Sequence, residues 1–384
     1  MAELNIPSHE TLTKWSRDDY KQYNRAHRYR SYIGMDQNSI IQRNDQLREE
    51  GETVRVFFTD DMARRNIGTG TLRGNEAQWG TDYYDLKPIW IRDAVSIKKS
   101  DAKRSALNKY REQRSQLKTF VANTEYQQVI DAFNAIAYDA SAYSEVGSAD
   151  GSTRAHVAQV TYEEASETQR DAYVTANSDR LLFGAAESNL SAGDMSASLA
   201  NIDSSNDTAS AAGLELLKRM AQRDQWATGG VRPIRPVSTR DEKGREFFKV
   251  ICGEIGFRDF SNDEDIKSYN TDARLRGVED HPLFQDGDLL YKGMVIHYEP
   301  RLTSIGNVGA SSIPVEPIHL LGAQALGNAV GQKYKYTNDA TDDYGFFKNI
   351  GIEEQCSFEK MLYQGGDRAG KMHGMLTWYV SGAS

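Results

Sequence analysis

The order of helical and strand-like segments along the chain predicts an α+β fold. Residues 101–138 contain neither proline nor glycine, and their apolar side chains recur at helical spacing. Runs with strand character, such as 53–58 and 245–252, occur on both sides of this segment. These runs do not alternate regularly with helical segments, as they would in a parallel βαβ sheet, so we expect α+β rather than α/β organisation.

The composition indicates a chain with a large core and no membrane span. Its 384 residues are 39% apolar, which allows two or more subdomains. No apolar run is long enough to cross a bilayer, and the first residues, MAELNIPSHETLTKW, lack the charged and apolar regions of a secretory signal. Cys252 and Cys356 lie far apart in the sequence, which predicts neither a metal site nor a disulfide framework and suits a reducing cytosol.

Charge is distributed unevenly along the chain. The formal net charge is −9, which argues against a generic nucleic-acid binder and suits either an ordinary soluble protein or an acidic wall around nucleic acid. Residues 9–33 are instead basic, rich in tyrosine and poor in apolar side chains. We predict an extended or partly helical arm that another surface orders. Acidic protein neighbours are the favoured surface, and nucleic acid is the alternative.

Two strand-like runs flank a polar excursion that is rich in glycine. The runs are 53–58 and 83–97, in which apolar and polar residues alternate. The excursion between them has few large apolar residues apart from Ile67, Leu72 and Trp79. Such an excursion is uncommon inside a compact domain and is usually functional or disordered. The pattern therefore predicts a protruding hairpin.

Periodicity and turn residues place the remaining elements. Segment 101–138 is interpreted as one helix or two abutting helices meeting near Asn123, spanning roughly 55 Å as the backbone of an extended molecule. Further helices are expected at 38–47, 211–223 and 263–276. Strands are expected at 245–252, at 289–298 with a bulge at Gly293 as one interpretation, and as a closing pair within 344–362. Residues 139–210 are expected to form loops with short strands near 157–160 and 181–183.

The residues able to carry chemistry are scattered rather than grouped. Asp342-Asp343 and Glu353-Glu354 are adjacent pairs, and neighbours on a strand point to opposite faces, so neither pair predicts an acid/base dyad. The stretch GTGTLRGNE lacks the spacing of a phosphate-binding loop. The seven histidines include His281, His297 and His319, and none of them stands at the spacing of a metal-ligand pair. The sequence therefore predicts no enzyme activity, no cofactor and no metal site.

Several short motifs follow one another in a fixed order between residues 36 and 364. They are Leu72-Arg73-Gly74-Asn75-Glu76, Pro233-Ile234-Arg235-Pro236, His281-Pro282-Leu283-Phe284, Tyr291-Lys292-Gly293-Met294-Val295-Ile296, Leu321-Gly322-Ala323-Gln324-Ala325 and Asp343-Tyr344-Gly345. With the long helix between the first two, this order resembles the major capsid proteins of tailed bacteriophages with the Hong Kong 97-type fold, more narrowly a podovirus-type branch. His281 departs from the asparagine that is more frequent there, and segment 139–180 has no clear counterpart.

The resemblance implies a subunit with four parts. These are an N-terminal arm (1–50), an extended loop hairpin (51–97), a peripheral domain with a spine helix (98–180 and 326–384) and an axial domain (181–325). Such a subunit is expected to self-assemble into hexamers and pentamers of an icosahedral shell that encloses double-stranded DNA. It would be a virion protein that assembles in the cytoplasm of the host bacterium.

The resemblance also implies partners and alternatives. The expected partners are copies of the chain itself, portal and scaffold proteins, a decoration or cement protein, and packaged double-stranded DNA on the inner face, with no membrane. An encapsulin-like cellular shell of the same fold is the main alternative, and an enzyme of unknown type and a nucleic-acid-binding module are others.

The hairpin supplies the candidate site residues. Its loop has no core of its own, so a neighbouring subunit is the expected source of order. The residues predicted to make inter-subunit contacts are Arg64, Arg65, Leu72, Arg73, Glu76 and Trp79. Gly70 and Gly74 are expected to allow the turn geometry.

Overall fold

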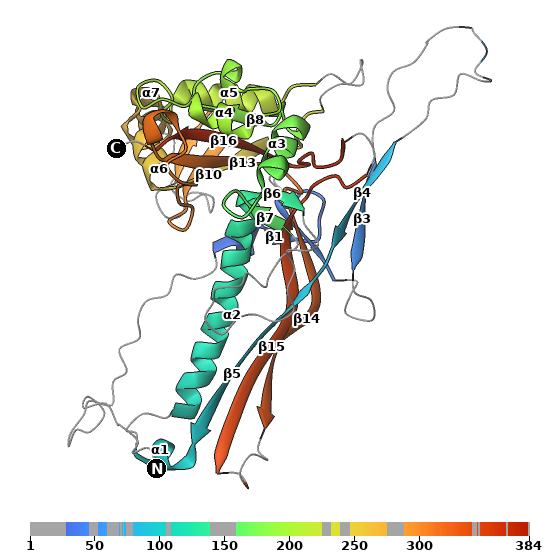
Figure 1. Cartoon of the computed structure of the whole chain (residues 1–384), viewed down its shortest axis with the longest axis vertical. Coiled ribbons are helices and arrows are strands. Elements are labelled where there is room, and N and C mark those ends of the chain that lie inside the picture. Colours follow the sequence, from blue (N-terminus) through green and yellow to red (C-terminus); the bar gives the residue numbers. More distant parts are fainter. Residues whose placement is uncertain are drawn as a thin grey trace.

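Two β-sheets organise the chain, one in an elongated leg and one in a rounder body (Figure 1). We define the leg as the five-stranded sheet with helix α2, and the body as the seven-stranded sheet with the helices packed on it. The computed structural model describes residues 28–45, 53–59, 69, 71, 73, 80–104, 109–138, 159–224, 232–238, 246–274, 288–339, 344, 346–365 and 368–382.

Helices and strands are mixed along the chain, which confirms the predicted α+β class. The α-helices are α1 (Lys99–Arg104), α2 (Lys109–Asn134), α3 (Glu167–Ala176), α4 (Met195–Ala200), α5 (Ala211–Ala221), α6 (Glu254–Asn262) and α7 (Glu264–Arg274). The 3-10 helices are η2 (Arg28–Tyr32), η5 (Glu187–Asn189) and η8 (Ala310–Ser312). None of the helices in the described part of the chain is long and apolar enough to cross a membrane.

The strands fall into two large sheets and two pairs. They are β1 (Ile33–Gly34), β2 (Ile41–Asn44), β3 (Val54–Thr59), β4 (Thr81–Leu86), β5 (Ile89–Lys98), β6 (Ala135–Tyr138), β7 (Gln159–Thr161), β8 (Leu181–Phe183), β9 (Val237–Ser238), β10 (Glu246–Cys252), β11 (Leu289–Tyr291), β12 (Met294–Tyr298), β13 (Val315–Leu321), β14 (Leu326–Asp339), β15 (Phe347–Lys360) and β16 (Met375–Ser381). The leg sheet has the order β1-β2-β14-β15-β5. The body sheet has the order β11-β12-β10-β13-β16-β8, with β9 beside β10.

Strands β14 and β15 form the long axis of the leg. Each has 14 residues, and they pair antiparallel with Leu326 opposite Lys360. Strand β5 pairs with the other edge of β15, and β2 runs parallel to β14. The strand pair predicted within 344–362 is therefore a single long strand in this region, and its partner comes from β14.

Helix α2 covers one face of the leg sheet (Figure 1). It extends over 26 residues, about 39 Å, without the proline or glycine that would interrupt it. Leu117 and Val121 of α2 pack against Ile97, Ile350 and Ile352 of the sheet. From Asn349 to Cys356, residues of β15 alternate between buried positions facing α2 and half-buried positions on the other face, and the strand is buried throughout from Cys356 to Lys360.

The long helix differs from its prediction at both ends. Helix α1 ends at Arg104 and α2 begins at Lys109, and residues 105–108 lie outside the described part. At the other end, Ala135–Tyr138 form β6, which pairs antiparallel with β7. The predicted continuation to 138 is wrong because pairing with a strand distant in sequence decides the conformation there.

The helix predicted at 38–47 is also wrong over its described residues. Ile41–Asn44 form β2 between β1 and β14. Ile40 and Ile41 are buried, and the backbone N–H of Leu326 donates to the Ile40 carbonyl at 3.2 Å. A short apolar pair does not distinguish helix from strand, and the edge of β14 decides the outcome.

The body sheet is covered on both faces. Every residue of β13 and of β16 is buried. Leu320 and Trp378 belong to the core formed with α5 and α6, whereas Leu321 and Met375 belong to the core formed with α2. Gly213 of α5 lies so close to Trp378 that a Cβ atom there would stand 2.3 Å from the indole ring. The close approach of α5 to the sheet therefore requires glycine at this position.

The segment predicted as one strand at 289–298 is a tight hairpin. Strands β11 and β12 pair antiparallel with Tyr291 opposite Met294, so the loop contains only Lys292 and Gly293. Both loop residues have positive φ, 43° and 80°, as a two-residue type I′ turn requires. Gly293 is therefore a turn residue, and the bulge interpretation is wrong.

Residues 159–224 contain more helix than the sequence indicated. The short strands predicted near 157–160 and 181–183 are confirmed as β7 and β8, but helices α3 and α4 were expected to be loops. Helix α3 begins with a capping box, in which Ser166 accepts from Gln169 N and Gln169 bonds back to Ser166 N. Helix α6 was not predicted either. The elements predicted at 211–223, 245–252 and 263–276 are confirmed as α5, β10 and α7.

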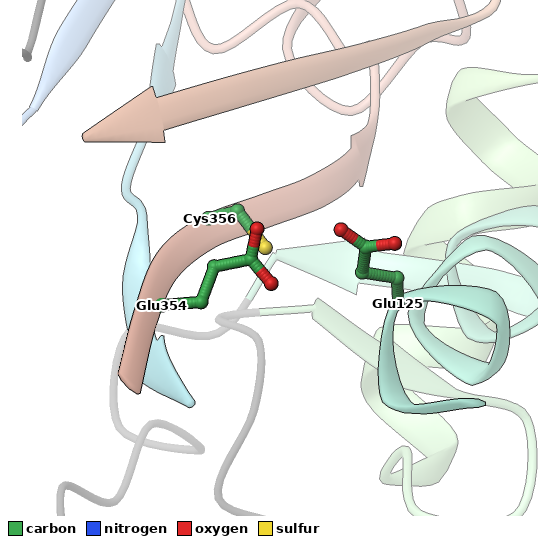
Figure 2. A group of neighbouring side chains, drawn as sticks. All are labelled: Glu125, Glu354 and Cys356. Atoms are coloured by element: carbon green, nitrogen blue, oxygen red, sulfur yellow. The ribbon is translucent and has the colours of Figure 1, made fainter. Parts of the chain in front are cut away.

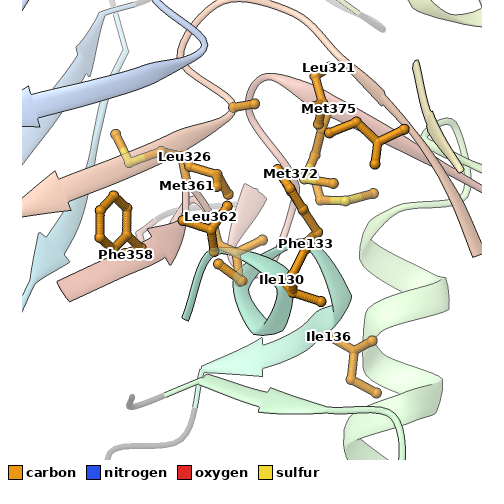
Figure 3. Close-up of a cluster of buried hydrophobic side chains, with 14 of the residues drawn as sticks. Ile130, Phe133, Ile136, Leu321, Leu326, Phe358, Met361, Leu362, Met372 and Met375 are labelled. Carbon is orange, nitrogen blue, oxygen red and sulfur yellow. The ribbon is translucent and has the colours of Figure 1, made fainter. Parts of the chain in front are cut away.

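One buried cluster joins the leg to the body (Figure 3). Ile130 and Phe133 of α2 pack there with Phe358 of β15. Met372 and Met375 reach the same cluster from the body side. The two sheets therefore share a continuous core at their junction and are not separate globules joined by a linker.

Candidate assembly surfaces and buried clusters

Strands β3 and β4 form a two-stranded hairpin beside the leg (Figure 1). Its outer face carries a bidentate ion pair, in which Arg55 Nε and Nη2 donate to the two Asp85 oxygens at 2.7 and 2.8 Å. The same guanidinium lies 4.1 Å from the Tyr83 ring centroid. Phe57 projects from the hairpin with 67% of its surface exposed. The strand predicted at 53–58 is confirmed, and the run predicted at 83–97 lies within β4 and β5, which are separated at Lys87-Pro88.

The opposite face of the hairpin is anchored to the junction. The Phe58 ring lies 4.4 Å from the His373 ring and 4.9 Å from the Tyr363 ring. Tyr84 donates to Glu359 at 2.6 Å, and burial raises the pKa of Glu359 to about 7. The base of the hairpin is therefore fixed by the subunit's own core, while its outer face is open.

The structure places only one of the predicted contact residues. Arg73 is exposed on the isolated subunit. Arg64, Arg65, Leu72, Glu76 and Trp79 lie outside the described residues, so their predicted role stays a prediction.

Part of the predicted arm is docked on its own subunit. Residues Arg28–Tyr32 form η2, and Tyr29 is buried against Tyr126 of α2. Both tyrosines donate to the carboxylate of Glu299, at 2.7 and 2.5 Å. The prediction of an extended arm lying on a neighbour is therefore wrong for 28–34, because two buried tyrosines hold this segment. Residues 1–27 lie outside the described part.

Three potential metal ligands meet between α2 and β15 (Figure 2). Glu125 comes from α2, and Glu354 and Cys356 come from alternate positions of β15 that face the helix. Their ligand atoms all lie within 4.8 Å of one another. Arg30 Nη2 lies 3.4 Å from Glu125 Oε2 at the edge of the group.

Burial shifts the titration of this cluster. It raises the pKa of Glu354 to about 8, with repulsion from Glu125 as the second cause. Burial also raises the pKa of Glu125, and it raises that of the Cys356 thiol well above its usual value. The sequence predicted no metal site, because its histidines and cysteines lack ligand spacing and Glu125 is far from the other two residues along the chain. The alternation that puts Glu354 and Cys356 on one strand face was the available signal.

The other sequence candidates have structural roles where they are described. Glu353 points away from Glu354, as predicted, and accepts from Gln332 at 3.2 Å. His319 Nε2 lies 3.1 Å from Asn134 Oδ1, and burial lowers its pKa. Cys252 is buried in the body. Asp342, Asp343 and His281 lie outside the described residues.

A second buried polar group lies at the edge of the body sheet. Asp288 accepts from Lys249 Nζ at 2.9 Å and lies beside His297 Nδ1. All three side chains are at most 6% exposed. Burial acts to raise the pKa of Asp288, but the hydrogen bond to His297 and the Lys249 ammonium together hold this pKa below its usual value. This group is a buried ion pair between Lys249 and Asp288, with His297 bonded to the same carboxylate.

Comparison with known proteins gives the family. The family model described as phage capsid protein matches residues 4–382, nearly the whole chain. The chain belongs to the phage capsid protein family. None of the curated protein sequences matches this capsid protein.

Solved phage capsids share the architecture. The capsid protein is similar to a chain of the cyanophage Pam1 capsid asymmetric unit, with a TM-score of 0.80, 24% identity and 100% of both chains covered. It is also similar to the capsid of Ralstonia phage GP4, with a TM-score of 0.71, 16% identity and coverage of 98% and 96%. The capsid of Helicobacter pylori bacteriophage KHP30 follows with a TM-score of 0.65, 10% identity and 99% of both chains covered. The predicted Hong Kong 97-type fold is confirmed.

These comparisons fix the general role of the protein. It is a major capsid protein that forms a shell and resides in the virion. Family membership favours the phage shell over the encapsulin-like alternative, which gains no support.

Proposed function

We propose that this capsid protein forms hexamers and pentamers of an icosahedral shell around double-stranded DNA, and that hairpin β3–β4 grips a neighbouring subunit. The observation that carries the proposal is the hairpin itself. It is a two-stranded sheet whose base is anchored and whose outer face is open. The subunit's own core covers one face of this hairpin, and an adjacent subunit in a shell would supply the surface for the other face.

The residues between β3 and β4 strengthen this argument. Ordering a segment of this length costs about 1–2 kcal/mol per residue in backbone entropy. The adjacent subunit of a lattice is the most direct source of a compensating gain. Arg73 and Glu76 are proposed to make polar contacts there, with Arg64 and Arg65 beside them, and Leu72 and Trp79 are proposed to be buried against the neighbour.

The four-part division is proposed with three adjustments. The leg corresponds to the peripheral domain, and the body corresponds to the axial domain at 181–325. Sheet membership favours assigning β5 to the leg instead of the extended loop. It also favours assigning β16 to the body, because β16 pairs with β13 and β8. The arm is proposed to comprise residues before Tyr29.

The finer biological context is also proposed. Portal, scaffold and decoration or cement proteins are the expected partners besides the chain itself, and the shell would assemble in the cytoplasm of the host bacterium. A structural role without catalysis is proposed from the family and from the structural contacts made by the described candidate residues.

Electron cryo-microscopy of purified particles tests the proposal. Six-fold and five-fold capsomers should be resolved, with the tip of each β3–β4 hairpin lying on an adjacent subunit. Shells in which every hairpin tip lies on its own subunit would contradict the proposed grip, although the protein would still be a shell protein.

A further inference from the structure

The cluster between α2 and β15 has the donor set of a cation site. Two carboxylates and one thiol converge from two elements that are distant in sequence (Figure 2). Glu354 and Cys356 stand on the same face of β15, and Glu125 faces them from α2. The mutual separation of at most 4.8 Å lets one ion contact all three ligand atoms with small side-chain adjustments.

A buried oxygen gives an independent reason to expect a ligand. Glu354 is only 5% exposed, and its Oε2 atom accepts no hydrogen bond from an N–H or hydroxyl group of the described residues, so that the Glu125 carboxyl is the polar group facing the Glu354 carboxyl. A carboxylate oxygen that is removed from water without a partner is costly, and such atoms are rare in folded proteins. A cation coordinated at this position would satisfy it.

The local charges favour a divalent ion. Two carboxylates and a thiolate carry three negative charges, and Arg30 beside Glu125 supplies one positive charge. Arg43, the other nearby cation, is paired with Asp45 at 2.6 Å. A divalent ion would therefore bring the group of Glu125, Glu354, Cys356 and Arg30 to zero net charge, which suits a buried position.

The ligand types select the class of ion. A thiolate is a soft ligand and is a poor partner for Mg²⁺ or Ca²⁺, whereas Zn²⁺ accepts both thiolate and carboxylate ligands. A tetrahedral ion would have its fourth position open to water. At the edge of the group, the Arg30 side chain is 62% exposed and the Glu125 side chain is 15% exposed.

We propose that Glu125, Glu354 and Cys356 bind one thiophilic divalent cation of the Zn²⁺ class, which ties α2 to β15. The thiol loses its proton to solvent when the sulfur–metal bond forms, and any proton on the carboxylates leaves in the same way. The site is contained in one subunit, so the inference does not depend on the proposed hexamers, pentamers or hairpin grip.

Titration of the metal-free capsid protein with CoCl₂ tests the site directly. Cobalt bound to a thiolate gives a charge-transfer band in the near ultraviolet, and ZnCl₂ should abolish this band by displacement. The band should be absent from Cys356→Ser and unchanged in Cys252→Ser, which alters the other buried free cysteine. Absence of a band in the unaltered protein, or a band of equal intensity in Cys356→Ser, would overturn the proposal.

A second measurement guards against misfolding of the cysteine variant. One equivalent of ZnCl₂ should raise the Tm of the unaltered protein, because an ion that binds only the folded state stabilises it. Glu354→Gln keeps the shape of the side chain and should lose most of this increase, whereas Glu353→Gln on the opposite strand face should keep it. Equal increases in the two variants would refute the assignment of Glu354 as a ligand.

Discussion

The body and the leg bury their strands in different ways. All residues of β13 and β16 in the body are buried, because helices and the junction core cover both faces of the sheet. In the leg, β5 has a run of exposed positions, and Trp90 on this strand is 49% exposed. The body thus carries its own stabilisation, whereas the leg presents a sheet face that a shell can use.

The leg's open face is polar where its strands lie side by side. Arg92 of β5 stands opposite Glu353 of β15, and Lys335 of β14 stands opposite Glu353 on its other side. A row of alternating charge keeps this face soluble in the free subunit. The difference teaches that the two sheets of one chain reach stability differently, one by burial of both faces and the other with one face left to polar side chains.

The largest expected effect is the removal of Trp378 from the body sheet. Trp378 is fully buried, and its indole N–H donates to the Gly184 carbonyl at 2.7 Å. Trp378→Ala should reduce the free energy of unfolding by about 3–5 kcal/mol through cavity formation. Urea unfolding of dissociated subunits, followed by circular dichroism, measures it. A loss below 1 kcal/mol would remove the proposed contrast between body and leg.

The second prediction concerns Lys360 at the end of β15. Its amine is buried and donates to the Ala135 carbonyl, and burial lowers its pKa from 10.5 to about 7. Between these two values the unfolded chain holds more protons, so this group makes stability rise with pH through that window. Lys360→Met should remove this rise and stabilise the subunit near neutral pH by about 1–3 kcal/mol.

Urea unfolding at several pH values between 6 and 11 checks this prediction. Lys249→Met in the body is the matched control, because Lys249 is equally buried but is ion-paired with Asp288. That control should destabilise the protein, since it removes the lysine of a buried ion pair and leaves the Asp288 carboxylate with His297 alone. Destabilisation by both substitutions would contradict the prediction, because it would show that the Lys360 amine stabilises the fold as the ion-paired Lys249 does.

The third prediction concerns the hairpin tip. Arg73→Ala with Glu76→Ala should change subunit stability little, because an exposed pair contributes about 0–1 kcal/mol. Assembled shells should nevertheless melt at a lower temperature, since the contact is repeated at every subunit. Calorimetry of shells and circular dichroism of subunits separate the two effects. Shells of unchanged melting temperature would show that the tip is not the proposed grip.

The smallest expected effect on the free subunit is that of Trp90→Ala on the leg. An exposed side chain away from special features changes unfolding free energy by at most about 0.5 kcal/mol. Comparison with Trp378→Ala by the same urea assay contrasts the same residue type in leg and body. A destabilisation comparable to that of Trp378→Ala would mean that the leg face is not open in solution.

The sequence predicted elements whose pattern is local and failed where a distant partner decides. Helix α5 and strand β10 follow from periodicity alone. Strand β2 was interpreted as helix because its conformation depends on β14, and β6 was included in the long helix because its partner β7 lies across segment 139–158. Helices α3 and α4 are rich in small and polar residues, although Ser166 and Gln169 gave a recognisable capping signal.

The two candidate sites also differ in whether a local sequence pattern reveals them. The hairpin was predicted because its two strands are close in sequence and the loop composition is unusual. The cluster of Glu125, Glu354 and Cys356 was missed because only the packing of α2 on β15 brings these residues together. A sequence search for metal ligands tests spacing along the chain, and the pair Glu354 and Cys356 gives no indication of the third ligand, which lies on α2.

The shared core at the junction has a mechanical consequence. Close-packed interiors are hardly compressible and transmit strain, so Ile130, Phe133 and Phe358 couple leg and body as one stiff piece. A pull on the base of the hairpin at Phe58 acts on Tyr363 and His373, and from there on the strand that leads to Met375. Outward pressure on one subunit would therefore be carried as tension through this junction, from the leg strands to the body sheet.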